Sequence, residues 1–329
     1  MIKIMSNYIR GDLLIYTNNG IKRLDKLSKV DDLVYNENNL PTVIDQLNRN
    51  SIKNYYLYKI KTIHNIDNYY LGGTNNIYCI QNIPFDLKIR DCVNFIENNT
   101  RICSPSFVSV SEITEFDYIG YPYPDINAYV NINENNNETN DETNDENNDE
   151  DDKYRFQGLV LLQQTVFELN NNLNKNTIGF LNKYLHNNNI PFEIFNNNIK
   201  TTIKFNINDI KLLTITEINA LSNKNIKILI DGFSEINSLI NTTDKSVFYL
   251  LKNIYMKNGI LLTANYMNNN YVIKIPQKTD ISDNNYFIYN NYIWSKIKKI
   301  TKSDKYNGQL FTLKLKDNSK FLTEIGVIS

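Results

Sequence analysis

The sequence is poor in the residues that most metal and nucleophile sites need. It has two histidines, His64 and His186, and three cysteines, Cys79, Cys92 and Cys103, without a Cys-x-x-Cys pair. This spacing excludes the usual tetrahedral zinc site, and three scattered cysteines are typical of a reducing compartment. Glycine is also scarce, with 11 residues, and the sequence has no glycine-rich phosphate loop and no Ser/His/Asp constellation.

The sequence also lacks a signal peptide and an apolar run of about 18 or more residues. We therefore expect a soluble intracellular protein, in the cytoplasm, the nucleus, or a viral factory or virion, with no membrane partner. The abundant Asn, Ile, Lys and Tyr have AT-rich codons, which are typical of genomes such as those of large DNA viruses.

Charge is unevenly spread although the net charge is −1. Residues 131–152 contain ten acidic residues and no Lys or Arg, which leaves 26 acidic against 35 basic residues elsewhere, a net charge of +9. A tract of Asn, Glu, Asp and Thr cannot bury apolar area, so it predicts an acidic disordered loop. The basic remainder is compatible with the phosphate backbone of a nucleic acid.

Both ends of the chain have the alternation and the Asn- and Gly-rich turns of β structure. Turns are predicted at Asn18-Asn19-Gly20 and at Asn307-Gly308. His64 is predicted in a further turn at the surface, and Trp294 is predicted in the core. The predicted strands are Leu13–Thr17, Leu33–Tyr35, Tyr56–Thr62, Asn68–Leu71, Tyr292–Ile300, Gln309–Leu315 and Lys320–Ser329, with a further β-rich stretch at Val108–Pro124.

The middle of the chain contains a repeat. Predicted helices at Thr177–His186 and Ser246–Met256 are each followed by a strand, an Asn-rich turn and a second strand. Upstream, Phe156–Leu169 is apolar at near-helical spacing, and Gly158 and Gly232 occupy matching places in two helix-like segments. Glycine inside a helix costs about 1 kcal/mol relative to alanine. Its presence predicts that two helix backbones pack closely there, and one chain with both halves of such a pair is expected to be a monomer.

This order predicts an α+β protein in which a β-rich domain is interrupted by an insertion. The β-rich domain covers 1–130 and 286–329, and the acidic disordered loop covers 131–152. The inserted αβ domain covers 153–285, with repeats at 153–225 and 226–285.

Short motifs in the β-rich parts resemble those of self-splicing inteins, in the same order along the chain. These are Gly11–Gly20, Leu27–Tyr35, Tyr58–Thr62 with Gly73–Asn76, Ser111–Pro122, Gly308–Leu315 and Phe321–Ile328. The resemblance implies a horseshoe-shaped β domain of the Hint (hedgehog–intein) fold and acyl-transfer chemistry. It places Tyr8 at the nucleophile position, Thr74 and Ile77 at the ends of the Thr-x-x-His motif, and Thr312 where an acidic residue is common.

These substitutions are expected to prevent splicing. The oxygen of a phenol lies too far from its own backbone for the short-ring acyl shift, and Ile77 has no proton to give. The sequence stops at Ser329, so the family's terminal His-Asn pair is expected to be missing as well.

The two repeats resemble LAGLIDADG homing endonucleases, whose paired helices each end in an acidic residue that binds Mg²⁺ between the DNA strands. The corresponding positions here are Gln163 and Asn237, with Glu235 nearby. Amides are poor Mg²⁺ ligands beside phosphates, so Mg²⁺ is expected as a cofactor only where nuclease activity persists. Double-stranded DNA is the expected partner.

The resemblance leads to a hypothesis with two alternatives. The hypothesis is a stand-alone intein-like protein, related to self-splicing homing endonucleases, that neither splices nor cuts DNA but retains DNA binding. One alternative is an active site-specific endonuclease with displaced acids such as Glu168 or Glu235. The other is a structural or interaction subunit that reuses the fold.

Overall fold

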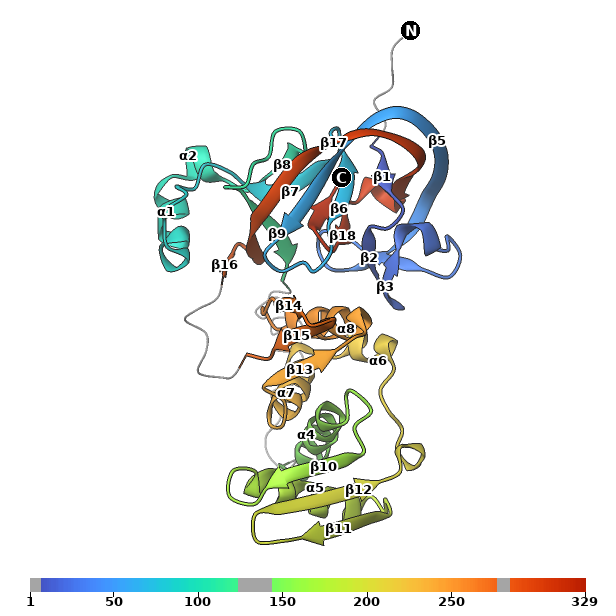
Figure 1. The fold of residues 1–329 in the computed structure, drawn as a ribbon, viewed down its shortest axis with the longest axis vertical. Helices are drawn as coiled ribbons and strands as arrows, with labels where there is room; N and C mark the ends of the chain where they lie inside the picture. The colour runs from blue at the N-terminus through green and yellow to red at the C-terminus, as the bar shows by residue number, and fades with distance from the viewer. Residues whose placement is uncertain (1–6, 124–143, 277–284) are drawn as a thin grey trace, which may run out of the picture. The chain divides into compact units, whose positions relative to one another are not determined.

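A computed structural model describes residues 7–123, 144–276 and 285–329 of an α+β chain (Figure 1). Among these residues, contacts define two units. Unit 1 lies within Met1–Asp125, Gly259–Asn269 and Asp280–Ser329, and unit 2 within Ile126–Asn258 and Asn270–Thr279. No helix in the described part of the chain is both long and apolar enough to cross a membrane.

Unit 1 is built on one extended sheet in which thirteen strands are described. Two short helices, α1 (Cys92–Asn98) and α2 (Thr100–Cys103), accompany it. The strands are β1 (Ile9–Arg10), β2 (Leu14–Thr17), β3 (Gly20–Arg23), β4 (Leu33–Tyr35), β5 (Pro41–Thr62), β6 (Tyr69–Gly72), β7 (Asn76–Ile80), β8 (Ser106–Ser109), β9 (Tyr118–Pro122), β16 (Tyr286–Tyr289), β17 (Tyr292–Leu315), β18 (Phe321–Thr323) and β19 (Gly326–Ile328).

The long strands β5 and β17 organise unit 1. They run antiparallel as one curved ribbon, and β17 also pairs with β1 and β9 (Figure 1). The turn predicted at Asn307-Gly308 is wrong, because β17 continues through it. The Asn307 side chain accepts a hydrogen bond from the Asn54 backbone N–H at 2.8 Å, so the polar pair joins two strands rather than reversing the chain.

The core of unit 1 contains both a predicted and an unpredicted buried ring. Trp294 is fully buried, as expected, and its indole N–H donates to the Tyr289 carbonyl at 2.9 Å. His64 was expected at the surface, and this prediction is wrong: the residue is 2% exposed and its ring packs edge-on against Tyr286. The turn pattern around His64 could not reveal this, because the covering residues, Tyr286 and Leu262, are far away in sequence.

The elements of the inserted region follow one order twice: helix, strand, helix, strand, strand. The first strand pairs antiparallel with the last in both series, β10 with β12 and β13 with β15. The first series is α4 (Asn144–Leu159), β10 (Val166–Asn170), α5 (Lys175–Asn187), β11 (Phe192–Asn196) and β12 (Lys200–Phe205). After α6 (Ile215–Ala220), the second is α7 (Asn223–Ser234), β13 (Leu239–Thr242), α8 (Lys245–Met256), β14 (Ala264–Met267) and β15 (Asn270–Lys274).

Helix α4 corrects two expectations. The predicted loop at 131–152 is wrong from Asn144 onward, where α4 begins, and residues 131–143 lie outside the described residues. Acidic residues near a helix N-terminus interact favourably with the helix dipole, and Asp151 also forms an ion pair with Lys224 of α7 at 2.8 Å. The helical spacing predicted through Leu169 is also wrong, because α4 ends at Leu159 and β10 follows.

A buried lysine makes the stability of unit 2 depend on pH. Lys257 is 8% exposed, and its ammonium donates a hydrogen bond to the Asn219 carbonyl at 2.6 Å. Burial lowers the pKa of Lys257 from 10.5 to about 8. The unfolded chain therefore binds more protons than the folded one between these two pKa values, and the free energy of unfolding rises with pH across that range.

We predict that Lys257→Met removes this rise. Between about pH 7.5 and about pH 9.5, the native protein should gain roughly 2 kcal/mol of unfolding free energy relative to the variant. Urea unfolding followed by the helical circular dichroism signal at each pH measures the difference. Parallel pH profiles for the two proteins would contradict the lowered pKa.

Candidate functional site

The chain segments that the intein resemblance singles out meet around the backbone of Tyr8. Its carbonyl oxygen accepts a hydrogen bond from the Gly72 N–H at 2.7 Å and from the Asn75 side-chain amide at 2.8 Å. Gly72 ends β6 and Asn75 directly precedes β7, so the β6–β7 turn holds Tyr8 from two sides. Thr74 lies within the same turn.

Ser329 joins this cluster. Its N–H donates to the Asn76 carbonyl at 2.9 Å, and its carbonyl accepts from the Asn76 N–H at 3.2 Å. The Asn7 side-chain amide also donates to the Ser329 carbonyl at 3.2 Å. Residues 7 and 8, the β6–β7 turn and residue 329 therefore converge at one place in unit 1.

The convergence leaves little free space. A Cβ atom added at Gly72 would lie 2.6 Å from the Tyr55 hydroxyl oxygen and 3.0 Å from the Tyr8 carbonyl oxygen. The rings of Tyr8 and Tyr55 also meet edge to face, with centroids 5.3 Å apart. A larger residue at position 72 would displace the Tyr55 ring and crowd the Tyr8 carbonyl, so glycine favours the close approach.

Ile77 lies in the strand that directly follows the β6–β7 turn, whereas Thr312 lies on β17. Ile77 is fully buried in β7, and it lies two residues beyond Asn75. Within the sheet, Ile77 lies opposite Val108 of β8 and Ile328 of β19. Thr312 lies on β17 opposite Asn48, next to Phe311, which pairs with Ile9.

A second set of predicted residues lies where α4 and α7 pack together in unit 2. A Cβ atom added at Gly158 would collide with the Leu229 carbonyl oxygen, and one at Gly232 would collide with the Arg155 carbonyl oxygen. Each glycine thus contacts the residue three positions before the other glycine. This contact is reciprocal, as expected where two helices are related by an approximate twofold axis.

Gln163 and Asn237 follow the C-terminal ends of these helices. Gln163 has a left-handed backbone, with φ of 58°, and its N–H donates to the Val160 carbonyl at 2.7 Å. The Asn237 amide donates to the Phe233 carbonyl at 2.9 Å, within the last turn of its own helix. Neither side chain carries the negative charge that a Mg²⁺ site beside phosphates requires.

The two nearby acids are engaged by cations. The Glu235 carboxylate accepts hydrogen bonds from the Arg155 guanidinium at 2.7 and 3.0 Å and from the Thr177 hydroxyl at 2.8 Å. Glu168 pairs with Lys200 at 3.1 Å on β10, within the sheet rather than at a helix end. A carboxylate held by a bidentate arginine is a weak candidate for metal coordination.

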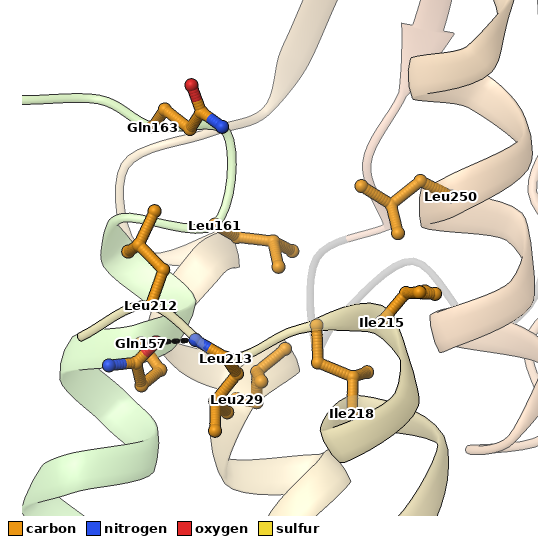
Figure 2. Close-up of a pocket in the computed structure, with 9 residues that line it drawn as sticks. All are labelled: Gln157, Leu161, Gln163, Leu212, Leu213, Ile215, Ile218, Leu229 and Leu250. Atoms are coloured by element: carbon orange, nitrogen blue, oxygen red, sulfur yellow. Dashed lines mark hydrogen bonds between the residues drawn. The ribbon is translucent and has the colours of Figure 1, made fainter. Parts of the chain in front are cut away.

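A pocket of about 180 Å³ lies beside α4 (Figure 2). The Gln157 side chain borders it and fixes the segment before α6, because it accepts from the Leu213 N–H at 3.0 Å and donates to the Lys211 carbonyl at 2.9 Å. The lining contains no carboxylate, thiol or imidazole: it consists of Gln157, Leu161, Gln163, Leu212, Leu213, Ile215, Ile218, Leu229 and Leu250. The pocket therefore offers packing space but no reactive group.

Sequence reasoning missed the side chains that hold both places together. Asn75 contacts Tyr8 across 67 residues, and Arg155 contacts Glu235 across 80. Neither residue had a local signal for its partner: Asn75 follows the predicted strand Asn68–Leu71, and Arg155 precedes the helical spacing predicted at Phe156–Leu169.

The chain matches no model of a known protein family, and no curated protein matches its sequence.

Proposed function

We propose that this chain is an intein-like protein, with a Hint-like β unit interrupted by a LAGLIDADG-like unit, that neither splices nor cuts DNA but binds DNA. The observation that carries the proposal is the convergence of Tyr8, the β6–β7 turn and Ser329. These segments are distant in sequence, and they correspond to the three places that an intein must bring together for acyl transfer. The reciprocal packing of Gly158 and Gly232 supports the second half of the proposal.

The loss of splicing follows from the groups at the convergence. An acyl shift needs a thiol or hydroxyl one bond from the backbone of its own residue, and Tyr8 offers a phenol instead. The Ile77 side chain, in β7 directly after the turn, is an alkyl group that can neither donate nor accept a proton. The hydrogen bonds from Gly72 and Asn75 hold the carbonyl of Tyr8 itself, and neither Tyr8 nor Ile77 offers a group that could activate the peptide bond before Tyr8.

The loss of cleavage follows from the helix ends in unit 2. Two-metal or shared-metal hydrolysis of a phosphodiester needs carboxylates that face the scissile phosphate. Gln163 and Asn237 supply neutral amides, and the charge of Glu235 is balanced by Arg155. This balance favours a non-cleaving protein over a nuclease with a displaced acid.

The test places the native sequence between two folded reporter proteins. We expect the intact mass of this precursor to stay unchanged over a day, and supercoiled plasmid to remain uncut by the same preparation in Mg²⁺ or Mn²⁺. The mass is followed by mass spectrometry and the plasmid by gel electrophoresis. A ligated reporter pair would overturn the loss of splicing, and a nicked plasmid would overturn the loss of cleavage.

A further inference from the structure

The β5–β17 ribbon of unit 1 is strongly basic. The two strands contain ten Lys and Arg residues against two acids, Asp45 and Asp304. The basic residues are Arg49, Lys53, Lys59, Lys61, Lys296, Lys298, Lys299, Lys302, Lys305 and Lys314. This ribbon holds a large share of the chain's positive charge in two adjacent strands.

The strand register gathers part of this charge on one face. Lys61 lies directly opposite Lys299, and Lys59 lies between Thr301 of β17 and Tyr70 of β6. Residues directly opposite share a face, and residues two apart on one strand do so too. The other face buries Ile60, which is opposite Ile300, so Lys59, Lys61 and Lys299 point away from the core. We call these three residues the lysine face.

Like charges directly opposite each other destabilise a sheet unless an anion neutralises them. Lys61 and Lys299 form such a pair at the centre of the lysine face. In the described part of the chain, no ion pair joins Lys59, Lys61 or Lys299 to a carboxylate. Glu115 lies beside the ribbon, where its carboxylate accepts from the Ile300 N–H at 3.4 Å, but no ion pair among the described residues joins it to these lysines. The face is therefore built for an external anion.

Other cations of β17 lie outside the lysine face. Lys298 occupies the register shift between Ile297 and Lys299. Lys302 is one residue beyond Thr301, so it points to the opposite side of the strand, where its ammonium lies 4.3 Å from the centre of the Tyr56 ring. Within the lysine face, charges about 7 Å apart along β5 and about 5 Å apart across to β17 form a compact cluster, as contact with a phosphate backbone requires.

The sheets of unit 2 are less basic. On the outward face of the β10–β12–β11 sheet, Lys200 and Lys204 alternate with the buried Thr201 and Ile203. Glu168 is across from Thr202 and pairs with Lys200, and Glu193 is across from Lys204, so the charges balance. In the β13–β15 pair, Lys274 is the one basic residue. The open sheet faces of unit 2 therefore offer little net attraction to a phosphate backbone.

We infer that the lysine face of the β5–β17 ribbon binds the sugar-phosphate backbone of duplex DNA. The inference rests on the proposed function, since it says where an intein-like protein of this kind contacts DNA. The face reads no base sequence, because contacts between ammonium groups and phosphate oxygens position the protein on the duplex but carry no sequence information. The residues opposite Lys59, Tyr70 and Thr301, are not aliphatic side chains that would enter the acyl region of a lipid surface.

The test measures the salt dependence of binding by the full chain to a fluorescent duplex of about 30 base pairs. The logarithm of the affinity falls linearly with the logarithm of the salt concentration, and each lost phosphate contact makes this line less steep by about 0.9. The triple variant Lys59→Gln, Lys61→Gln, Lys299→Gln should reduce the steepness of this line by about 2 to 3. It should also reduce affinity at low salt by more than about tenfold. The matched control Lys200→Gln, Lys204→Gln, Lys274→Gln removes the same charge from unit 2 and should leave the slope unchanged.

Thermal melting of each variant distinguishes a loss of DNA contacts from a loss of the folded structure. Because the lysine-face variant removes the repulsion between Lys61 and Lys299, it should melt at or above the native temperature. A less steep salt dependence in the control variant alone would show that DNA binds elsewhere, and it would overturn the inference that the lysine face contacts DNA. Native protein that does not bind the duplex at low salt would overturn DNA binding itself. Lysine-dependent binding to phosphatidylserine vesicles without binding to the duplex would replace DNA with a lipid surface and overturn the inference.

Discussion

Replacing Gly158 by alanine is expected to destabilise unit 2 by about 3 kcal/mol or more. The new methyl group would collide with the Leu229 carbonyl oxygen and lie 2.9 Å from the Phe233 nitrogen, and both atoms belong to the backbone of α7. A backbone cannot rotate away as a side chain can, so the two helices must separate or shift. Urea unfolding followed by circular dichroism measures the loss.

Gly179 provides a matched control. It lies in the interior of α5, is exposed, and has no atom within 4 Å of an added Cβ. Gly179→Ala should therefore stabilise the protein by about 1 kcal/mol through helix propensity alone. If Gly158→Ala behaved like Gly179→Ala, the close approach of α4 and α7 would be absent.

The reciprocity of the contact adds a second expectation to this comparison. Gly232→Ala would collide with the Arg155 carbonyl oxygen, the counterpart of Leu229 in α4. Once one methyl group has opened the interface, the second should cost less than it does alone. The double variant is therefore expected to be less destabilised than the two single losses predict together.

Local patterns were sufficient for elements whose local preference agrees with their tertiary contacts. The predicted strand Leu33–Tyr35 matches β4, and the predicted helix Ser246–Met256 differs from α8 by one residue at its start. The Asn18-Asn19-Gly20 turn is confirmed, since Thr17 pairs with Gly20 and Gly20 has a φ of 94°. Periodicity and turn residues act over a few positions, so they determine such elements directly.

Elements whose stability depends on distant residues could not be predicted in the same way. The first part of α4 looks disordered by composition, but its Asp151 pairs with Lys224 of α7. The Asn307-Gly308 pair has the composition of a turn, but β5 holds it in a continuous strand. In both cases tertiary contacts override the local preference.

The candidate sites divide along the same line. Motif order singled out Tyr8 and Thr74, and the repeat singled out Gly158 and Gly232, but neither indicated the roles of Asn75 and Arg155. The amide of Asn75 and the guanidinium of Arg155 have roles that only the folded chain defines, because their partners are remote in sequence.

If the proposed function is correct, introducing the groups that inteins carry at two positions is expected to permit the first step of splicing. In a variant with Tyr8→Cys and Ile77→His, the new thiol attacks the Asn7 carbonyl, the bond between residues 7 and 8 breaks, and the freed nitrogen takes a proton. The product is a thioester, which an added thiol cleaves to release everything before residue 8. Gly72 and Asn75 already hold the backbone of residue 8 in place.

The imidazole should contribute a measurable share of this rate. A positioned general acid or base contributes about 10²-fold or more, so the double variant should react that much faster than Tyr8→Cys with Ile77→Leu. The leucine control keeps the thiol and an alkyl group at position 77. Fluorescence of the buried Trp294 verifies that both variants are folded.

The most direct measurement is the rate at which a reporter fused before residue 1 is released when thiol is added. We predict no release from the native chain, slow release from the leucine control and the fastest release from the double variant. A folded double variant from which thiol releases no reporter would contradict the account, because Tyr8 and the β6–β7 turn would then not form the remnant of a splicing centre.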